Sequence, residues 1–174
     1  MGQILDKLYR AAAVVSAVLI ALICVLISTQ ILLNGLGRVM PGILPSTIPS
    51  YADFSGFMLA ASTFLALAYT LRSGGHIRVN LFVERLPKTA ASWLEGFVLL
   101  AALGFVGVGL WSAGALVGES WHYGDVSSGI IPIPLWIPQT TMCFGLGLLF
   151  TALAHTLIDL LVSRHPILCS AEPE

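Results

Sequence analysis

The sequence predicts an all-α integral membrane protein with four transmembrane helices, and three observations lead to that prediction. Only 10% of the 174 residues are charged, whereas a typical globular domain carries about 25%. Apolar residues make up 57% of the chain, and the mean hydropathy is +0.91. The apolar residues gather into four runs, each long enough, at about 1.5 Å per helical residue, to cross a bilayer. We expect residues 1–174 to form a single transmembrane domain.

This composition excludes several classes of protein. So few charges cannot cover a water-facing surface, which argues against a soluble enzyme or a disordered chain. The formal net charge of -1 lacks the basic excess of a nucleic-acid-binding protein, so no nucleic-acid partner is expected. Cys24, Cys143 and Cys169 show no CxxC or Cys/His spacing, so the sequence indicates neither a disulfide framework nor a zinc site.

The predicted spans cover residues 11–33, 51–71, 93–117 and 135–162. The first carries no charge and is too long for the apolar region of a cleaved signal peptide, so we expect it to be retained. Secondary transporters that carry their own substrate usually contain two related halves. No internal repeat is visible here, which argues against an autonomous transporter.

Basic residues are distributed unevenly between the predicted loops. With four spans, seven of the eight fall on one side of the membrane: Lys7, Arg10, Arg72, Arg78, Arg85, Lys88 and Arg164. The opposite side has only Arg38. Because Lys and Arg are enriched in cytoplasmic loops, the pattern predicts that both termini lie in the cytoplasm.

The two predicted outer loops, residues 34–50 and 118–134, are poor in charge and rich in proline. Dense proline disfavours regular helix and favours extended, semi-rigid segments. These loops could form a fixed docking surface outside the membrane, or they could be plain connectors.

The segment 71–87, between the second and third spans, carries the most informative pattern. Four apolar residues recur at the spacing of one helical face: Val79, Phe82, Val83 and Leu86. Asn80 can cap such a helix and Pro87 can end it. We therefore predict a short amphipathic helix in the cytoplasmic interface. It either floats among the head groups or packs under neighbouring helices and fixes the angle between the two spans.

The same segment, LRSGGHIRVNLFVERLP, resembles the signature of the DctQ-type small membrane subunit of tripartite ATP-independent periplasmic (TRAP) transporters. That family's pattern is His-Ile-Arg-Val-Asp, then apolar residues, then Leu-Pro. The matching residues are His76, Ile77, Arg78, Val79, Leu86 and Pro87. Asn80 departs from the usual Asp, since it keeps a capping oxygen but loses the charge.

Weaker similarities lie in the outer regions. Asn34 and Arg38 resemble the family's Asn-x-x-x-Arg, and Asp53 stands near the position where the family often has Glu after an aromatic residue. The segment 133–136, Ile-Pro-Leu-Trp, resembles the family's Ile-Pro-x-Trp before the fourth span.

The resemblance implies a non-catalytic scaffold subunit in the bacterial inner membrane. Its partners would be a large (M-type) membrane subunit that moves substrate like an elevator, a periplasmic solute-binding (P-type) protein, and membrane lipids. Substrates of the family are usually organic acids, and uptake is driven by an ion gradient. No cofactor is expected on this chain, because the resemblance places the sodium sites on the large subunit.

Ionisable residues near lipid are functional candidates, because each is costly unless it is paired. Arg38 and Asp53 could form an ion pair at the outer interface, or both could reach the head groups. Glu95 is expected to pair with Arg72, Arg78 or Lys88.

The remaining polar residues indicate no chemistry of their own. His155 and Asp159 are four residues apart and predict a hydrogen-bonded pair rather than a metal site, since two ligands are too few. We predict no catalytic, substrate-binding or metal-binding residue. The expected structural and partner-contact positions are His76, Arg78, Asn80, Arg38 and Asp53.

An alternative function is the membrane anchor of a redox complex. Haem b usually needs histidine ligands on membrane helices. His155 is the one histidine expected within a span, because His76 and His122 are predicted to lie in loops and His165 in the C-terminal tail.

Small residues predict close helix packing. The third span contains Gly104, Gly107, Gly109 and Gly114, and the fourth contains Thr141 and Gly145 at GxxxG spacing. We expect the third span to pack within the chain.

Overall fold

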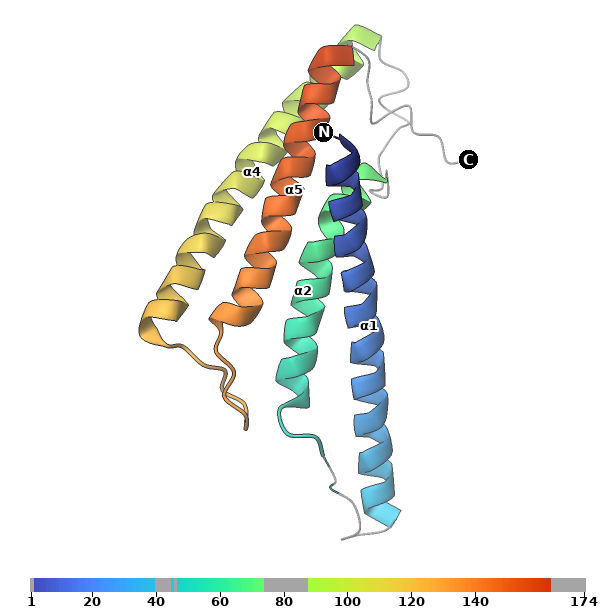
Figure 1. Cartoon of the computed structure of the whole chain (residues 1–174), viewed down its shortest axis with the longest axis vertical. Helices are drawn as coiled ribbons and strands as arrows, with labels where there is room; N and C mark the ends of the chain where they lie inside the picture. The colour runs from blue at the N-terminus through green and yellow to red at the C-terminus, as the bar shows by residue number, and fades with distance from the viewer. Residues whose placement is uncertain (1, 40–44, 46, 74–87, 164–174) are drawn as a thin grey trace.

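The computed structural model describes residues 2–39, 45, 47–73 and 88–163, which form four helices (Figure 1). Their bounds are α1 Gly2–Val39, α2 Tyr51–Arg72, α4 Lys88–Tyr123 and α5 Trp136–Ser163. All four are long and apolar enough to cross a membrane, which confirms the prediction of an all-α protein with four such helices. The predicted interfacial helix falls within residues 74–87, which lie outside the described residues.

The helices follow from apolar runs that contain few helix-breaking residues. Proline is absent from α1, α2 and α4. Pro138 lies in the first turn of α5, where an amide N–H has no partner within the helix, so its missing donor costs little. α4 continues past the predicted end of the third span to Tyr123, so Glu119 and His122 are helical rather than part of the outer loop as expected.

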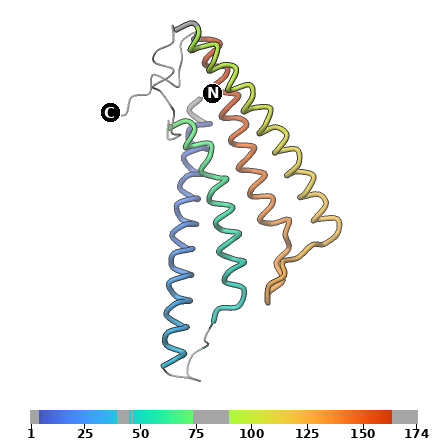
Figure 2. Tube along the Cα trace, turned by 180° about the vertical axis from the view of Figure 1, so that it is seen from behind, coloured from blue at the N-terminus to red at the C-terminus, as the bar shows by residue number. Residues whose placement is uncertain are grey.

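The four helices form an open row in the order α1, α2, α5, α4, which Figures 1 and 2 show from opposite sides. Among the described residues, the extensive helix contacts join α1 to α2, α2 to α5, and α5 to α4. α1 begins at the end of the row where α2 ends; we call this the N-terminal end. The opposite end carries residues 45, 47–50 and 124–135, and we call it the loop end.

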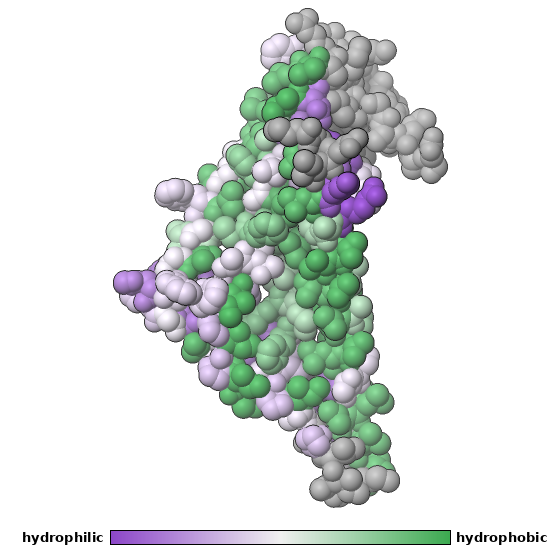
Figure 3. Space-filling model, in the orientation of Figure 1, coloured by the Kyte–Doolittle hydropathy of each residue, from purple (hydrophilic) through white to green (hydrophobic). Residues whose placement is uncertain are grey.

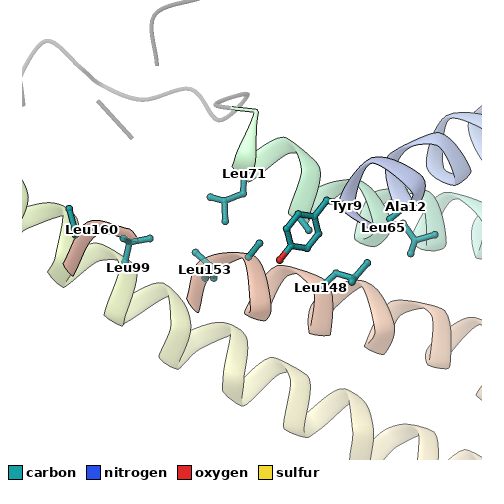
Figure 4. Close-up of a cluster of buried hydrophobic side chains, with 10 residues drawn as sticks. Tyr9, Ala12, Leu65, Leu71, Leu99, Leu148, Leu153 and Leu160 are labelled. Atoms are coloured by element: carbon teal, nitrogen blue, oxygen red, sulfur yellow. The ribbon is translucent and has the colours of Figure 1, made fainter. Parts of the chain in front are cut away.

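A small apolar core lies between the helices (Figure 4). Tyr9, Leu65 and Leu153 belong to it, and Ala152 is fully buried. Many larger apolar side chains face outward, including Phe105 at 83% and Trp111 at 81% exposed, and Figure 3 shows hydrophobic residues along α1. Exposing apolar surface to water costs about 25 cal/mol per Å². Such a surface therefore suits a lipid or protein environment.

α2 and α5 approach each other closely at Gly145. A Cβ atom at this position would lie 2.6 Å from the carbonyl carbon of Phe64, closer than side chains tolerate. The GxxxG spacing in the fourth span thus marks an internal packing contact, one of the alternatives open from the sequence alone.

The glycines of α4 behave differently from the expectation of internal packing. Gly107 faces α5, and a Cβ atom added to it would lie 3.5 Å from the Phe150 ring, as expected. Gly104, Gly109 and Gly114 have no neighbouring atom within 4 Å of the corresponding position. The expectation is wrong for these three because α4 sits at the edge of the row and contacts its neighbour along one face.

Candidate functional site

Polar contacts gather at the two ends of the row, and those at the loop end join its two outer loops. Ser50 immediately precedes α2 and has φ 54° and ψ 23°, a left-handed conformation that is uncommon for a residue with a side chain. Its hydroxyl does not cap α2. Instead, Ser50 Oγ accepts a hydrogen bond from the Ile131 N–H, with an N–O distance of 2.8 Å. The strained backbone is thus associated with a contact between segments 81 residues apart.

The connection between α4 and α5, residues 124–135, is an ordered hairpin-like loop, which we call the outer hairpin. Val126 and Pro134 form an isolated antiparallel bridge. The Ser127 N–H donates to the Ile133 carbonyl at 2.8 Å, and Ser127 Oγ accepts from the Ile133 N–H at 3.0 Å. At the base of the outer hairpin, the rings of Trp121 and Trp136 meet edge to face with centroids 4.9 Å apart. This loop is therefore an organised element and not an irregular connector.

Asp53 lies beneath the outer hairpin. Its Oδ2 atom occupies the space that a Cβ at Gly129 would need, and Ser50 Oγ lies 2.6 Å from the same point. The expected ion pair between Arg38 and Asp53 is absent from the contacts of these two described residues. Figure 1 gives the reason: α1 extends beyond the start of α2, which carries Arg38 in its last turn away from Asp53.

Gln30 is a polar residue whose role the sequence analysis missed. It is only 4% exposed, although it lies in the apolar run of α1. Its side-chain nitrogen donates to Thr47 Oγ1 at 3.0 Å, and its oxygen accepts from the Ile48 N–H at 2.7 Å. Gln30 therefore holds the first outer loop against α1. The one signal in the sequence was that Gln30 is the single side-chain amide within the predicted span 11–33.

At the N-terminal end, a cluster of charges joins three helices. Arg72 of α2 donates through Nη1 to Asp159 Oδ2 of α5 at 3.2 Å, and its Nη2 lies 3.8 Å from Asp6 Oδ1 of α1. His155 Nε2 lies 3.9 Å from Asp159 Oδ1. His155 and Asp159 thus adjoin as predicted, but at a distance too long for a hydrogen bond.

Glu95 was expected to pair with a basic residue at this end. The structure buries Glu95 near the start of α4, where it is 9% exposed. Arg72 bridges Asp6 and Asp159. The Lys88 side chain and Arg78 lie outside the described part of the chain, as do the predicted contact residues His76 and Asn80. In the segments that the structure describes, no three His, Cys, Asp or Glu residues gather in a metal-binding arrangement.

Buried hydroxyl groups within the row are occupied by internal hydrogen bonds. Ser16 Oγ of α1 donates to the Ser62 carbonyl of α2 at 2.7 Å. Thr156 Oγ1 of α5 donates to the Ala152 carbonyl one turn earlier at 2.9 Å. Tyr9 Oη donates to Thr151 Oγ1 at 3.4 Å and links α1 to α5. Ser16 and Tyr9 thus fasten helices to one another, while Thr156 is satisfied within α5, so these hydroxyl groups are already engaged inside the chain.

Comparison with known protein families gives a match over most of the chain. The family model described as "Tripartite ATP-independent periplasmic transporters, DctQ component" matches residues 27–163, which include part of α1 and all of α2, α4 and α5. No curated protein matches the chain, and no solved structure matches it. The redox-anchor alternative gains no support from this comparison.

Proposed function

Because this chain belongs to the DctQ family, whose members are small membrane subunits of TRAP transporters, we propose that it is a static scaffold for the large, elevator-type subunit. The single observation that carries the proposal is the family match across 27–163. The open row of helices agrees with it, because a row that buries few of its large apolar side chains offers wide faces to another membrane protein.

The chain would contribute no chemistry of its own. In this proposal the large subunit binds the solute, expected to be an organic acid, together with the sodium ions that drive uptake. The internal hydrogen bonds of Ser16, Tyr9 and Thr156 support this division of labour. No cofactor is proposed for this chain.

DctQ proteins are components of the bacterial inner membrane. We propose that the N-terminal end of the row faces the cytoplasm and that the loop end faces the periplasm. The supporting observation is the distribution of basic residues, seven of which fall on one side of a four-span chain.

Partner contacts are proposed at both ends. The segment with His76, Arg78 and Asn80 would form an interfacial helix against the large subunit, an assignment that rests on the family resemblance. Arg38 and Asp53 would lie on the periplasmic side, where the solute-binding protein arrives.

Co-purification tests the proposal. The tagged chain, expressed together with the large subunit of its transporter, should retain that subunit in mild detergent at a fixed ratio. An unrelated four-helix membrane protein with the same tag serves as the control. Recovery of the chain without the large subunit, under conditions in which both are folded in the membrane, would refute the scaffold role.

A further inference from the structure

An open apolar groove runs over α2 between α1 and α5, and we call it the α1–α5 groove. It has a volume of about 460 Å³. Leu8 and Val15 of α1 and Phe144 of α5 form its sides and are 42%, 49% and 54% exposed, whereas Leu65 of α2 forms its floor and is 6% exposed. The groove exists because α1 and α5 both pack on α2 but do not pack extensively on each other.

The polar side chains that line the α1–α5 groove are already hydrogen-bonded within their own helix. The hydroxyl groups of Thr140 and Thr141 donate to the carbonyls of Trp136 and Ile137 one turn earlier, at 2.7 and 3.4 Å. The other lining residues are Leu, Ala, Val and Phe. An unpaired polar group is costly in such surroundings, so the groove suits an occupant that is apolar along its length.

The size of the α1–α5 groove favours a hydrocarbon chain over a transmembrane helix. A helix with its side chains is about 10 Å across and rises about 5.4 Å per turn, so one turn occupies roughly 400 Å³. The groove therefore has room for about one turn, whereas a helix that crosses the membrane has several. Its volume is also about three times that of a cavity of about 150 Å³ that accepts benzene, so one side chain does not fill it.

Lys7 stands where the α1–α5 groove opens toward the N-terminal end of the row. It lies one turn before Ala11 and two turns before Val15 on the same side of α1, and both of these residues line the groove. Its side chain is exposed and makes no ion pair within the described part of the chain. The neighbouring Asp6 faces Arg72 instead, at 3.8 Å. A lysine at the end of an apolar groove matches a phosphate joined to a hydrocarbon chain.

We propose that the α1–α5 groove binds an acyl chain of one anionic phospholipid of the inner leaflet, with the Lys7 ammonium group beside the phosphate. The proposal uses the orientation given under the proposed function, in which the N-terminal end of the row faces the cytoplasm. Basic side chains at that surface attract anionic lipids. The groove adds a defined place for the lipid's chain, so the lipid should stay bound when the surrounding bilayer is removed.

The test counts the phospholipids that remain on the complex of this chain with the large subunit. The complex is reconstituted in nanodiscs of phosphatidylethanolamine and phosphatidylglycerol, then released and examined by native mass spectrometry. The wild type should retain phosphatidylglycerol in preference to phosphatidylethanolamine. K7Q should lower the retained phosphatidylglycerol about fivefold, the effect of one lysine near an anionic surface.

R10Q is the matched control for K7Q, because it removes a positive charge at the same end of α1. Leu8 and Ala12 each lie two residues from Arg10 and line the groove, so Arg10 points away from it. R10Q should retain the lipid as the wild type does.

A second pair of variants tests the groove itself. A11F places a ring in the groove at an exposed position and should lower the retention of both lipids. V25F adds a ring at a 63% exposed position of α1 beyond the groove and should change nothing. Thermal unfolding of each complex checks that the variants are folded.

Four results would overturn the proposal. Equal retention of the two lipids by the wild type, or equal retention in K7Q and R10Q, would remove the head-group contact. Equal retention in A11F and V25F would show that the groove does not hold the lipid. Loss of the large subunit from A11F but not from V25F would assign the groove to that subunit. Failure of the proposed function is distinguishable, because the wild-type chain would then form no complex with the large subunit.

Discussion

Arg72 at the end of α2 and Asp159 near the end of α5 form a charge-assisted hydrogen bond, with 3.2 Å between Nη1 and Oδ2. The same guanidinium lies 3.8 Å from Asp6 of α1. One side chain thus connects three of the four helices at the N-terminal end. In an open row, where α1 does not pack extensively on α5, such a connection restrains helices that share few apolar contacts.

Substitution R72Q should therefore destabilise the row by about 1–2 kcal/mol, between the values for exposed ion pairs and for hydrogen bonds to charged groups. Thermal unfolding in detergent measures the effect, and R10Q supplies an exposed control at the same end. A double-mutant cycle with D159N isolates the pairwise energy. Equal losses in R72Q and R10Q would show that the charge cluster does not hold the helices.

The close approach of Gly145 to Phe64 allows a direct test of the packing between α2 and α5. The variant G145A places a methyl group 2.6 Å from the Phe64 backbone, so α2 and α5 must separate. We expect a loss of about 1–3 kcal/mol, typical of overpacking. G147A lies on the same helix with no atom within 4 Å of the new methyl and should be neutral or slightly stabilising. If the two variants unfold alike, the close contact does not exist.

Ser50 is expected to control the order of the outer hairpin. S50A removes the acceptor for the Ile131 N–H and should speed hydrogen exchange at that amide by about tenfold, equivalent to the loss of about 1.4 kcal/mol of protection. S128A changes an exposed serine of the same loop and is the control. Exchange at Ile131 that is as slow in S50A as in the wild type would contradict the docking of the two loops.

Gln30 is expected to hold the first outer loop in place through its two side-chain hydrogen bonds. Q30L keeps the bulk of the side chain but loses both hydrogen bonds to residues 47 and 48, and we expect a cost of about 1–2 kcal/mol. Limited proteolysis within this loop should become faster. T29V alters a neighbour whose hydroxyl bonds within α1, and it should leave the cleavage rate unchanged. Similar cleavage of Q30L and wild type would rule out an anchoring role.

Orientation is a separate prediction. In a chain in which Cys24, Cys143 and Cys169 are replaced by Ser, I130C should react with an impermeant maleimide in intact cells, whereas V162C should react only after permeabilisation. The reason is that the loop end is assigned to the periplasm because only one of the eight basic residues, Arg38, falls on that side. The reverse pattern would invert the orientation, and labelling of both positions from one side would break the four-span topology.

Hydropathy alone was sufficient to predict four apolar helices, because the bilayer requires long apolar runs and the chain contains four. It could not predict the end of α4: residues 118–123 are neither apolar enough nor rich enough in proline to decide between helix and loop, and the structure continues the helix to Tyr123. Propensity is a weak guide at helix ends, where neighbouring contacts decide.

The sequence also did not predict which helices, and which residues on them, lie side by side. Glu95 was expected to pair with Arg72, Arg78 or Lys88, and no sequence signal indicated that Arg72 would also meet Asp159. The row places α5 beside α2 and brings Asp159 to Arg72. The order of helices in the row is set by side-chain fit, such as Gly145 against Phe64, and adjacency in sequence does not reveal it. For the same reason, the contact between Ser50 and Ile131 had no local signal.

The most direct test of the scaffold role is solute uptake into proteoliposomes under an imposed sodium gradient, with the solute-binding component supplied outside. We expect uptake when this chain and the large subunit are reconstituted together, and none when either is reconstituted alone. Uptake by this chain without the large subunit would contradict the scaffold role.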